Sequence, residues 1–169
     1  MINIDQLNTL SRQEFVGTLG GIYEHSPWIA EGVADLRPFG NVAALQTAMK
    51  TAVEESAEEV RLNLLRAHPE FAGKAATCGE LTEASTQEQG SLSLNKLPPE
   101  QHQRMQQLNA GFMEKFGFPG IVAVRKQNSV EDIFNLLESR LQNNLDDEIT
   151  AAMTQVHLIA ECRLLDLVE

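Results

Sequence analysis

His68 stands directly before Pro69 in the stretch 64-LLRAHPEFAG-73, at the end of a charged, helix-like run. A helical backbone conformation is disfavoured for the residue before a proline, so the helix is predicted to end at Ala67 or His68. An imidazole at such a break can point into a pocket, and free imidazole changes charge near neutral pH. His68 is therefore a candidate proton carrier. The plainer alternative is a histidine that interacts with the helix dipole.

Arg163 falls on the inward face of the last predicted helix. The other residues that recur on this face at steps of three and four are apolar: Ile149, Met153, Val156, Ala160 and Leu167. A guanidinium in an apolar stripe keeps its charge and needs an anionic partner. The partner is either a carboxylate of the protein or a substrate carboxylate, which the planar fork can hold with two hydrogen bonds. A snorkelling arginine stays open as a third reading.

A third candidate group lies in the stretch 82-TEASTQEQGSL-92. If this segment is helical, Ser85, Glu88 and Gln89 share one face, because they are three and four residues apart. That face offers a hydroxyl, a carboxylate and a carboxamide, a set of donors and acceptors that suits a ureido or imide group. The alternative is structural, with Ser85 and Glu88 as a capping box at the start of a helix.

Composition and charge argue against several classes of protein. The net charge is −11 and no Lys/Arg cluster is present, which disfavours a nucleic-acid partner. No apolar run approaches the roughly 20 residues of a membrane helix, and the N-terminus lacks the pattern of a secretory signal. Cys78 and Cys162 lack C-x-x-C spacing, as expected in a reducing compartment. We therefore expect a cytoplasmic protein that does not bind membranes.

No metal site is predicted. His25, His102 and His157 have no partners at the spacing of metal ligands, although His157 and Glu161 share a helical face. Glycine-rich phosphate-binding fingerprints are also absent from the sequence.

The elements that must position these groups are mostly helical. Capping, proline and glycine signals predict one helix that starts at Ser11 and another near Pro27. The ranges 42–53 and 56–67 are predicted to form either one bent helix or two separate helices. Further helices are predicted over 82–89, from Pro98-Pro99 to 116, over 129–143 and over 146–168. Periodicity leaves 118-FPGIVAVR-125 open between an extended segment and a helix start. With 169 residues, the chain is predicted to be a single all-α helical bundle, one domain over 1–169.

Four stretches in order and spacing resemble the family of 2-oxo-4-hydroxy-4-carboxy-5-ureidoimidazoline (OHCU) decarboxylases. They are Ser26-Pro27-Trp28-Ile29-Ala30-Glu31, His68-Pro69-Glu70-Phe71-Ala72-Gly73, Ser85-Thr86-Gln87-Glu88-Gln89 and Phe116-Gly117-Phe118-Pro119. The resemblance covers the chain from Leu7 to about Leu167. It implies an all-helical fold, typically a dimer, and catalysis of the last step from urate to (S)-allantoin.

The resemblance also implies roles for individual residues. His68 matches the catalytic histidine of the family, Glu88 its partner carboxylate, and Arg163 the arginine that meets the substrate. The matching substrate-binding wall comprises Pro69, Ser85, Thr86, Gln87, Glu88, Gln89, Gly120, Ile121, Val122, Ala123 and Val124. Gly120 departs from the pattern, because many members carry a bulky apolar residue there. Its small size is expected to enlarge the pocket or to loosen its wall.

The implied reaction needs no cofactor, because a C=N bond of the substrate can accept the electrons released with CO2. The expected partners are the substrate OHCU, a second copy of the chain in a homodimer, and a 5-hydroxyisourate hydrolase. Two other functions remain open from the residues. One is a non-catalytic module that binds ureides, and the other is a metal hydrolase that uses His68 and nearby carboxylates.

Overall fold

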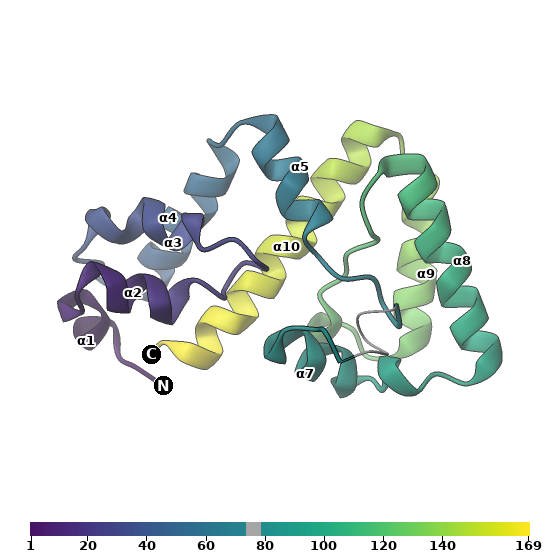
Figure 1. The fold of residues 1–169 in the computed structure, drawn as a ribbon, viewed down its shortest axis with the longest axis horizontal. Coiled ribbons are helices and arrows are strands. Elements are labelled where there is room, and N and C mark those ends of the chain that lie inside the picture. Colours follow the sequence, from purple (N-terminus) through teal and green to yellow (C-terminus); the bar gives the residue numbers. More distant parts are fainter. Residues whose placement is uncertain (74–78) are drawn as a thin grey trace. The chain divides into compact units, whose positions relative to one another are not determined.

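The computed structural model describes residues 1–73 and 79–169, and these residues are mainly helical (Figure 1). The α-helices are α1 Ile4–Thr9, α2 Arg12–Leu19, α3 Trp28–Val33, α4 Val42–Glu54, α5 Glu58–Arg66, α7 Glu83–Ser91, α8 Pro99–Phe116, α9 Val130–Arg140 and α10 Leu145–Leu167. Short 3-10 helices lie at η1 Ala34–Leu36, η2 Leu94–Lys96 and η3 Val124–Lys126. The all-α prediction is confirmed.

Contacts divide the chain into two compact units, and the division falls within α5 and within α10. The first unit comprises Met1–Leu64 with Ala160–Glu169, and the second comprises Leu65–Ile159. That the whole chain is one domain stays a prediction, and the two units are described separately below.

The first unit is built from short capped helices. Ser11 caps α2 and forms the predicted capping box with Glu14. Helix α3 begins after Pro27 and packs against α2 and α4. The two ends of the chain are tied together here, because the Ile2 amide donates to the Leu167 carbonyl oxygen at 2.9 Å. This bond accompanies an isolated bridge between Ile2 and Val168, outside any named strand.

The second unit centres on α8 and α9, which contact each other and are seen together in Figure 1. Pro99 is the first residue of α8, and Gly117 ends the helix with a φ of 76°, a left-handed conformation that glycine adopts without steric cost. Ser129 caps α9 as predicted, because its side chain accepts a hydrogen bond from the Asp132 amide.

The N-terminus of α7 differs from the capping alternative that the sequence left open. Thr82, not Ser85, is the N-cap residue, and its hydroxyl accepts from the Ser85 amide at 3.2 Å. Ser85 therefore lies inside the first turn of α7, where its side chain is buried. The capping-box reading of Ser85 and Glu88 is wrong, and their shared helical face is confirmed.

The predicted segment 118–125 is non-helical until η3, and residues Phe118 to Val124 are buried. Within it, Gly120 is tightly surrounded. A Cβ added there would lie 2.7 Å from Leu137 Cδ2 and 3.2 Å from two ring atoms of Phe112. Phe112 and Leu137 are themselves fully buried. The space that a side chain at Gly120 would need is therefore filled by the core.

Cys162 is a free, buried cysteine, and Cys78 lies outside the described residues. Within the described ranges, no helix combines the length and the apolar character needed to cross a membrane.

The packing around Gly120 predicts that Gly120→Ala lowers the free energy of unfolding by about 1–3 kcal/mol, because the added methyl group overpacks a filled core. Gly90→Ala in α7 is the matched control, since an added Cβ there meets nothing within 4 Å. That control is expected to be neutral or stabilising by up to about 1 kcal/mol. Urea unfolding followed by circular dichroism measures both, and equal effects would contradict the packing argument.

Candidate active site

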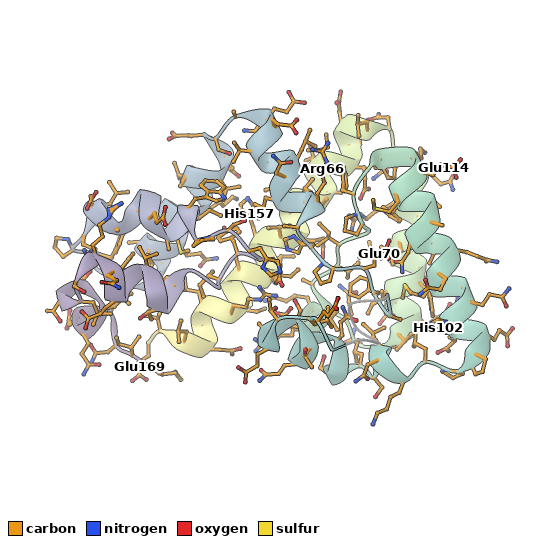
Figure 2. The ribbon with its side chains drawn as sticks, viewed as in Figure 1. Arg66, Glu70, His102, Glu114, His157 and Glu169 are labelled. Carbon is orange, nitrogen blue, oxygen red and sulfur yellow. The ribbon has the colours of Figure 1, made fainter. Side chains whose placement is uncertain are left out.

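His68 lies just beyond α5, on the segment that leads toward α7. Helix α5 ends at Arg66, one residue before the predicted end, and the His68 amide donates to the Leu65 carbonyl oxygen at 3.2 Å. Figure 2 labels Arg66 at the end of the helix and Glu70 on the segment that follows. The His68 residue is only 8% exposed. A buried imidazole at a helix break is consistent with the predicted proton carrier.

Gln89 ties this segment to α7. Its Oε1 accepts from the Ala72 amide at 3.3 Å, and its Nε2 donates weakly to the Glu70 carbonyl oxygen at 3.5 Å. Gln89 and Ser85 are buried, and Glu88 is partly buried on the same helix. The two elements that carry His68 and Glu88 are therefore joined through the residue next to Glu88.

Thr86 and Gln87 have exposed side chains on α7. The Thr86 hydroxyl donates to the Thr82 carbonyl oxygen at 2.9 Å, a contact within its own helix. Any part that these two residues take in binding a substrate stays a prediction.

Two residues of α8 hold the same segment, and the sequence analysis did not identify them. Asn109 Nδ2 donates to the Phe71 carbonyl oxygen at 2.8 Å, and Gln106 Nε2 donates to the Ala72 carbonyl oxygen at 2.9 Å. The apolar residues of α8 recur on the face that also carries Asn109, where a buried amide needs a partner. That pattern is the only signal in the sequence that could have singled out Asn109.

The predicted wall from Gly120 to Val124 is buried and held at two backbone positions. Arg140 Nη1 donates to the Ile121 carbonyl oxygen at 2.6 Å, and Gln155 Oε1 accepts from the Ala123 amide at 3.0 Å. Helix α7 packs against η3, which begins at Val124. The structure thus brings the end of this wall to the helix that carries Ser85, Glu88 and Gln89.

Arg140 is a buried cation with its own counter-ion. The fully buried Glu148 accepts two hydrogen bonds from Arg140, at 3.3 Å from Nε and 2.5 Å from Nη2. Asn143 Nδ2 adds a further hydrogen bond to Glu148 at 3.0 Å. A bidentate guanidinium–carboxylate pair is rigid, so the Ile121 carbonyl group is held by a fixed donor.

Arg163, in the first unit, forms an internal ion pair. Its Nη1 lies 2.8 Å from Glu24 Oε2, with side-chain exposures of 8% for Arg163 and 1% for Glu24. The same nitrogen donates to the Gly21 carbonyl oxygen at 3.3 Å. The inward position predicted for Arg163 is confirmed, and the internal ion pair is the alternative that the structure realises. A further contact of Arg163 with a substrate stays a prediction.

Glu24 is a charged residue of this unit that the sequence analysis missed. It precedes the stretch that begins at Ser26, and the Ser26 hydroxyl donates to the Glu24 carbonyl oxygen at 2.9 Å. Tyr23 directly precedes Glu24 in the sequence. Its burial, and to a smaller extent the Glu54 carboxylate, raises the pKa of the Tyr23 phenol. Tyr23 therefore adds no charge beside the pair at neutral pH.

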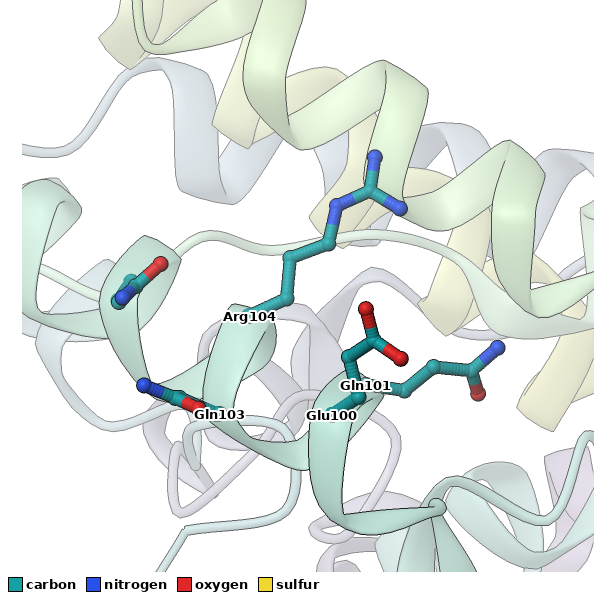
Figure 3. Close-up of a pocket in the computed structure, with 5 residues that line it drawn as sticks. Glu100, Gln101, Gln103 and Arg104 are labelled. Carbon is teal, nitrogen blue, oxygen red and sulfur yellow. The ribbon is translucent and has the colours of Figure 1, made fainter.

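A surface depression on α8 contains none of the predicted site residues (Figure 3). It is lined by Glu100, Gln101, Gln103, Arg104 and Gln107. The Arg104 guanidinium bonds to Glu138 at 2.7 Å and to Glu131 at 3.0 Å. These hydrogen bonds, Glu138 first, raise the pKa of Arg104, and the Arg104 bond lowers the pKa of Glu138. Arg104 is therefore neutralised by its own protein, and the depression offers little to an anionic ligand.

The three histidines without a predicted role lie in separate places along the chain: His25 lies between α2 and α3, His102 on α8 and His157 on α10. Figure 2 labels the last two. In the part of the chain that the structure describes, no three His, Cys, Asp or Glu residues are grouped as ligands of a metal ion would be.

Comparison with known proteins places the chain in a family. The model of the OHCU decarboxylase family matches residues 8–165. The 2-oxo-4-hydroxy-4-carboxy-5-ureidoimidazoline decarboxylase of Haloferax volcanii is 41% identical over 163 residues, covering 96% of this chain and 94% of that protein. The uric acid degradation bifunctional protein of Bacillus subtilis is 34% identical, covering 99% of this chain and 33% of that protein. The chain belongs to the OHCU decarboxylase family.

Solved structures agree with this assignment. The crystal structure of an (S)-allantoin synthase aligns with a TM-score of 0.79 and 29% identity, and it covers 99% of this chain. This chain spans only 54% of that protein. An OHCU decarboxylase crystallised in the presence of (S)-allantoin aligns with a TM-score of 0.68 over 91% of this chain; at 19% identity it supports the fold alone.

The buried ion pair in the first unit predicts that Glu24→Ala lowers the free energy of unfolding by about 3–5 kcal/mol, because the buried Arg163 would lose the carboxylate that lies 2.8 Å from its Nη1. Glu55→Ala removes an exposed carboxylate of the same unit and is expected to change stability by less than about 0.5 kcal/mol. Urea denaturation compares the two variants. Similar losses for both would show that the ion pair does not stabilise this unit.

Proposed function

We propose that this protein is a cofactor-independent carboxy-lyase that converts OHCU to (S)-allantoin, the last step of urate degradation. The observation that carries the proposal is the family match over residues 8–165, a range that includes His68, Glu88 and Arg163. The relatives of similar length that share 37–41% identity are named as decarboxylases of this compound.

The chemistry of the substrate explains why no cofactor is proposed. OHCU carries a carboxylate and a hydroxyl group on one ring carbon, next to a C=N bond. When the bond to the carboxylate breaks, its electron pair moves toward the C=N nitrogen, which takes up a proton, and CO2 leaves. The resulting enol loses the hydroxyl proton, and the ring carbon that carries the ureido group gains one. The substrate thus acts as its own electron acceptor, and the protein must orient it and supply protons on one face.

The proposed roles are those that the family resemblance implies, and the chemistry of the side chains suits them. His68, oriented by Glu88, moves protons between the hydroxyl group and the ring carbon. Arg163 anchors an anionic or polar group of the substrate. The supporting observation for the first pair is that Gln89 joins the His68 segment to the helix that carries Glu88.

The remaining contacts of the substrate are assigned to the wall. We propose that Pro69, the face of α7 and the backbone from Gly120 to Val124 form this wall, because α7 packs against η3 and the side chains of Arg140 and Gln155 hold the backbone of the 120–124 segment. Rigid support of this kind is what an enzyme needs to hold a carboxylate out of the ring plane during decarboxylation.

The test is His68→Asn, which keeps the size of the residue close to that of histidine and removes its proton transfer. Activity in forming allantoin is expected to fall by about 10²–10⁴-fold, the usual contribution of a general acid–base group. The product that remains is expected to approach a racemate, because protonation then comes from solvent. Circular dichroism of the product at known substrate concentration measures both effects.

His102→Asn on α8 is the matched control and is expected to retain full activity and stereoselectivity. Far-UV circular dichroism and thermal unfolding confirm that both variants fold. A His68→Asn variant that forms (S)-allantoin at the wild-type rate would overturn the assignment. A wild-type protein that binds ureides without accelerating turnover above the background would instead be a binding module, and loss of turnover with chelators would indicate a metal hydrolase.

We also propose that the chain works as a homodimer, as the family resemblance implies, and that it associates with a 5-hydroxyisourate hydrolase. Support for the second partner comes from the Bacillus subtilis relative, a bifunctional protein of uric acid degradation. Sedimentation velocity is expected to give twice the mass of one chain. A species with the mass of one chain at micromolar concentration would contradict the dimer. Co-purification with the hydrolase tests the second partner. Cytoplasmic location stays a prediction.

A further inference from the structure

The segment that follows His68 forms a tight turn with a buried backbone. Phe71, Ala72 and Gly73 are buried, and Ala72 has a φ of 50°, a left-handed conformation that costs energy for a residue with a side chain. A Cβ added at Gly73 would lie 3.0 Å from Glu70 Cβ and 3.2 Å from Glu70 Oε2. A turn with these features persists only where surrounding groups hold it in place.

The groups that hold it are carboxamides from two helices. Asn109 donates to the Phe71 carbonyl oxygen at 2.8 Å and Gln106 to the Ala72 carbonyl oxygen at 2.9 Å, while Gln89 accepts from the Ala72 amide at 3.3 Å. Asn109 is 4% exposed and Gln106 is partly buried. The two α8 residues are three apart and so share one face of the helix.

The turn is connected to His68 by a stiff link. Proline fixes its own φ and restricts the residue before it, so Pro69 leaves little rotational freedom between the turn and the imidazole. A displacement of the Phe71 and Ala72 carbonyl groups would therefore be passed in part to His68, because Pro69 removes one of the rotations that could absorb it.

We propose that Asn109 and Gln106 are positioning residues for the decarboxylation: their hydrogen bonds to Phe71 and Ala72 hold the turn that orients His68. The inference rests on the proposed function of His68. Neither residue needs to touch the substrate, because each acts through the backbone of the turn. Their loss should therefore lower the rate of proton transfer more than it weakens substrate binding.

The experiment compares kcat, KM and the enantiomeric excess of allantoin among variants of the full chain. Asn109→Ala is expected to lower kcat by about 100-fold, the cost of displacing a catalytic group by roughly 1 Å, with KM changed less than about threefold. Enantiomeric excess falls as spontaneous protonation contributes more of the product. Rates are measured well below the unfolding temperature of each variant, so that loss of folded protein does not enter kcat.

Gln106 allows a matched set of variants, because its side chain is only partly buried. Gln106→Met keeps the length of the side chain and removes the donor, and it is expected to lower kcat by roughly tenfold. Gln106→Lys keeps a donor at the end of a long side chain and is expected to restore kcat to within about threefold of wild type. Gln107→Met, on the exposed face of α8, is the control and is expected to leave kcat unchanged.

The outcomes separate this inference from the proposed function. If His68→Asn retains full activity, the proposed function fails. The positioning role fails if His68→Asn is inactive while Asn109→Ala and Gln106→Met keep the wild-type kcat. It also fails if these two variants change KM and kcat to the same extent and their unfolding temperature falls in parallel. Should Asn109→Ala not fold, the Met and Lys variants at Gln106 decide: equal kcat for the two would overturn the inference, and rescue by Lys would support it.

Discussion

Buried backbone outside helices needs hydrogen-bond partners that the helices cannot supply, and this constraint shapes the candidate site. The turn after His68 and the segment from Phe118 to Val124 are both buried and non-helical. Side chains take the place of a regular backbone ladder in each. Gln89, Gln106 and Asn109 bond to the first segment, and Arg140 and Gln155 bond to the second. These contacts give buried backbone groups of both irregular segments a hydrogen-bond partner.

Buried arginines follow the same rule in each unit. Arg163 meets Glu24 and the Gly21 carbonyl oxygen, and Arg140 meets Glu148 and the Ile121 carbonyl oxygen. Each cation thus meets a carboxylate that balances its charge and a backbone oxygen that accepts a hydrogen bond from it. Such pairs contribute little net stability compared with apolar packing, but losing one partner is costly. They fix the positions of the backbone segments that carry Gly21 and Ile121, and this positional role suits an enzyme that must orient a small anion.

Gly120 shows how a family pattern and packing can give different expectations. The pattern suggested a larger pocket or a looser wall where a bulky residue is missing. In this chain the space beside Gly120 is filled by Phe112 and Leu137, so the glycine makes room for the core of the second unit. The wall at this position is dense.

The sequence by itself determined most of the longer helices, because caps, prolines and apolar periodicity act over a few neighbouring residues. Helix α1 was not predicted, and α9 ends at Arg140 and not at Asn143. Ser11, Ser129 and Gly117 end or begin helices as their chemistry predicts, and the stripe around Arg163 identified it as inward-facing. Four motifs in the sequence also identified the family. Only the tertiary structure decided which distant groups meet: Glu24 with Arg163, and Asn109 with the turn after His68. Such pairings depend on how elements pack, and no local spacing in the chain encodes them.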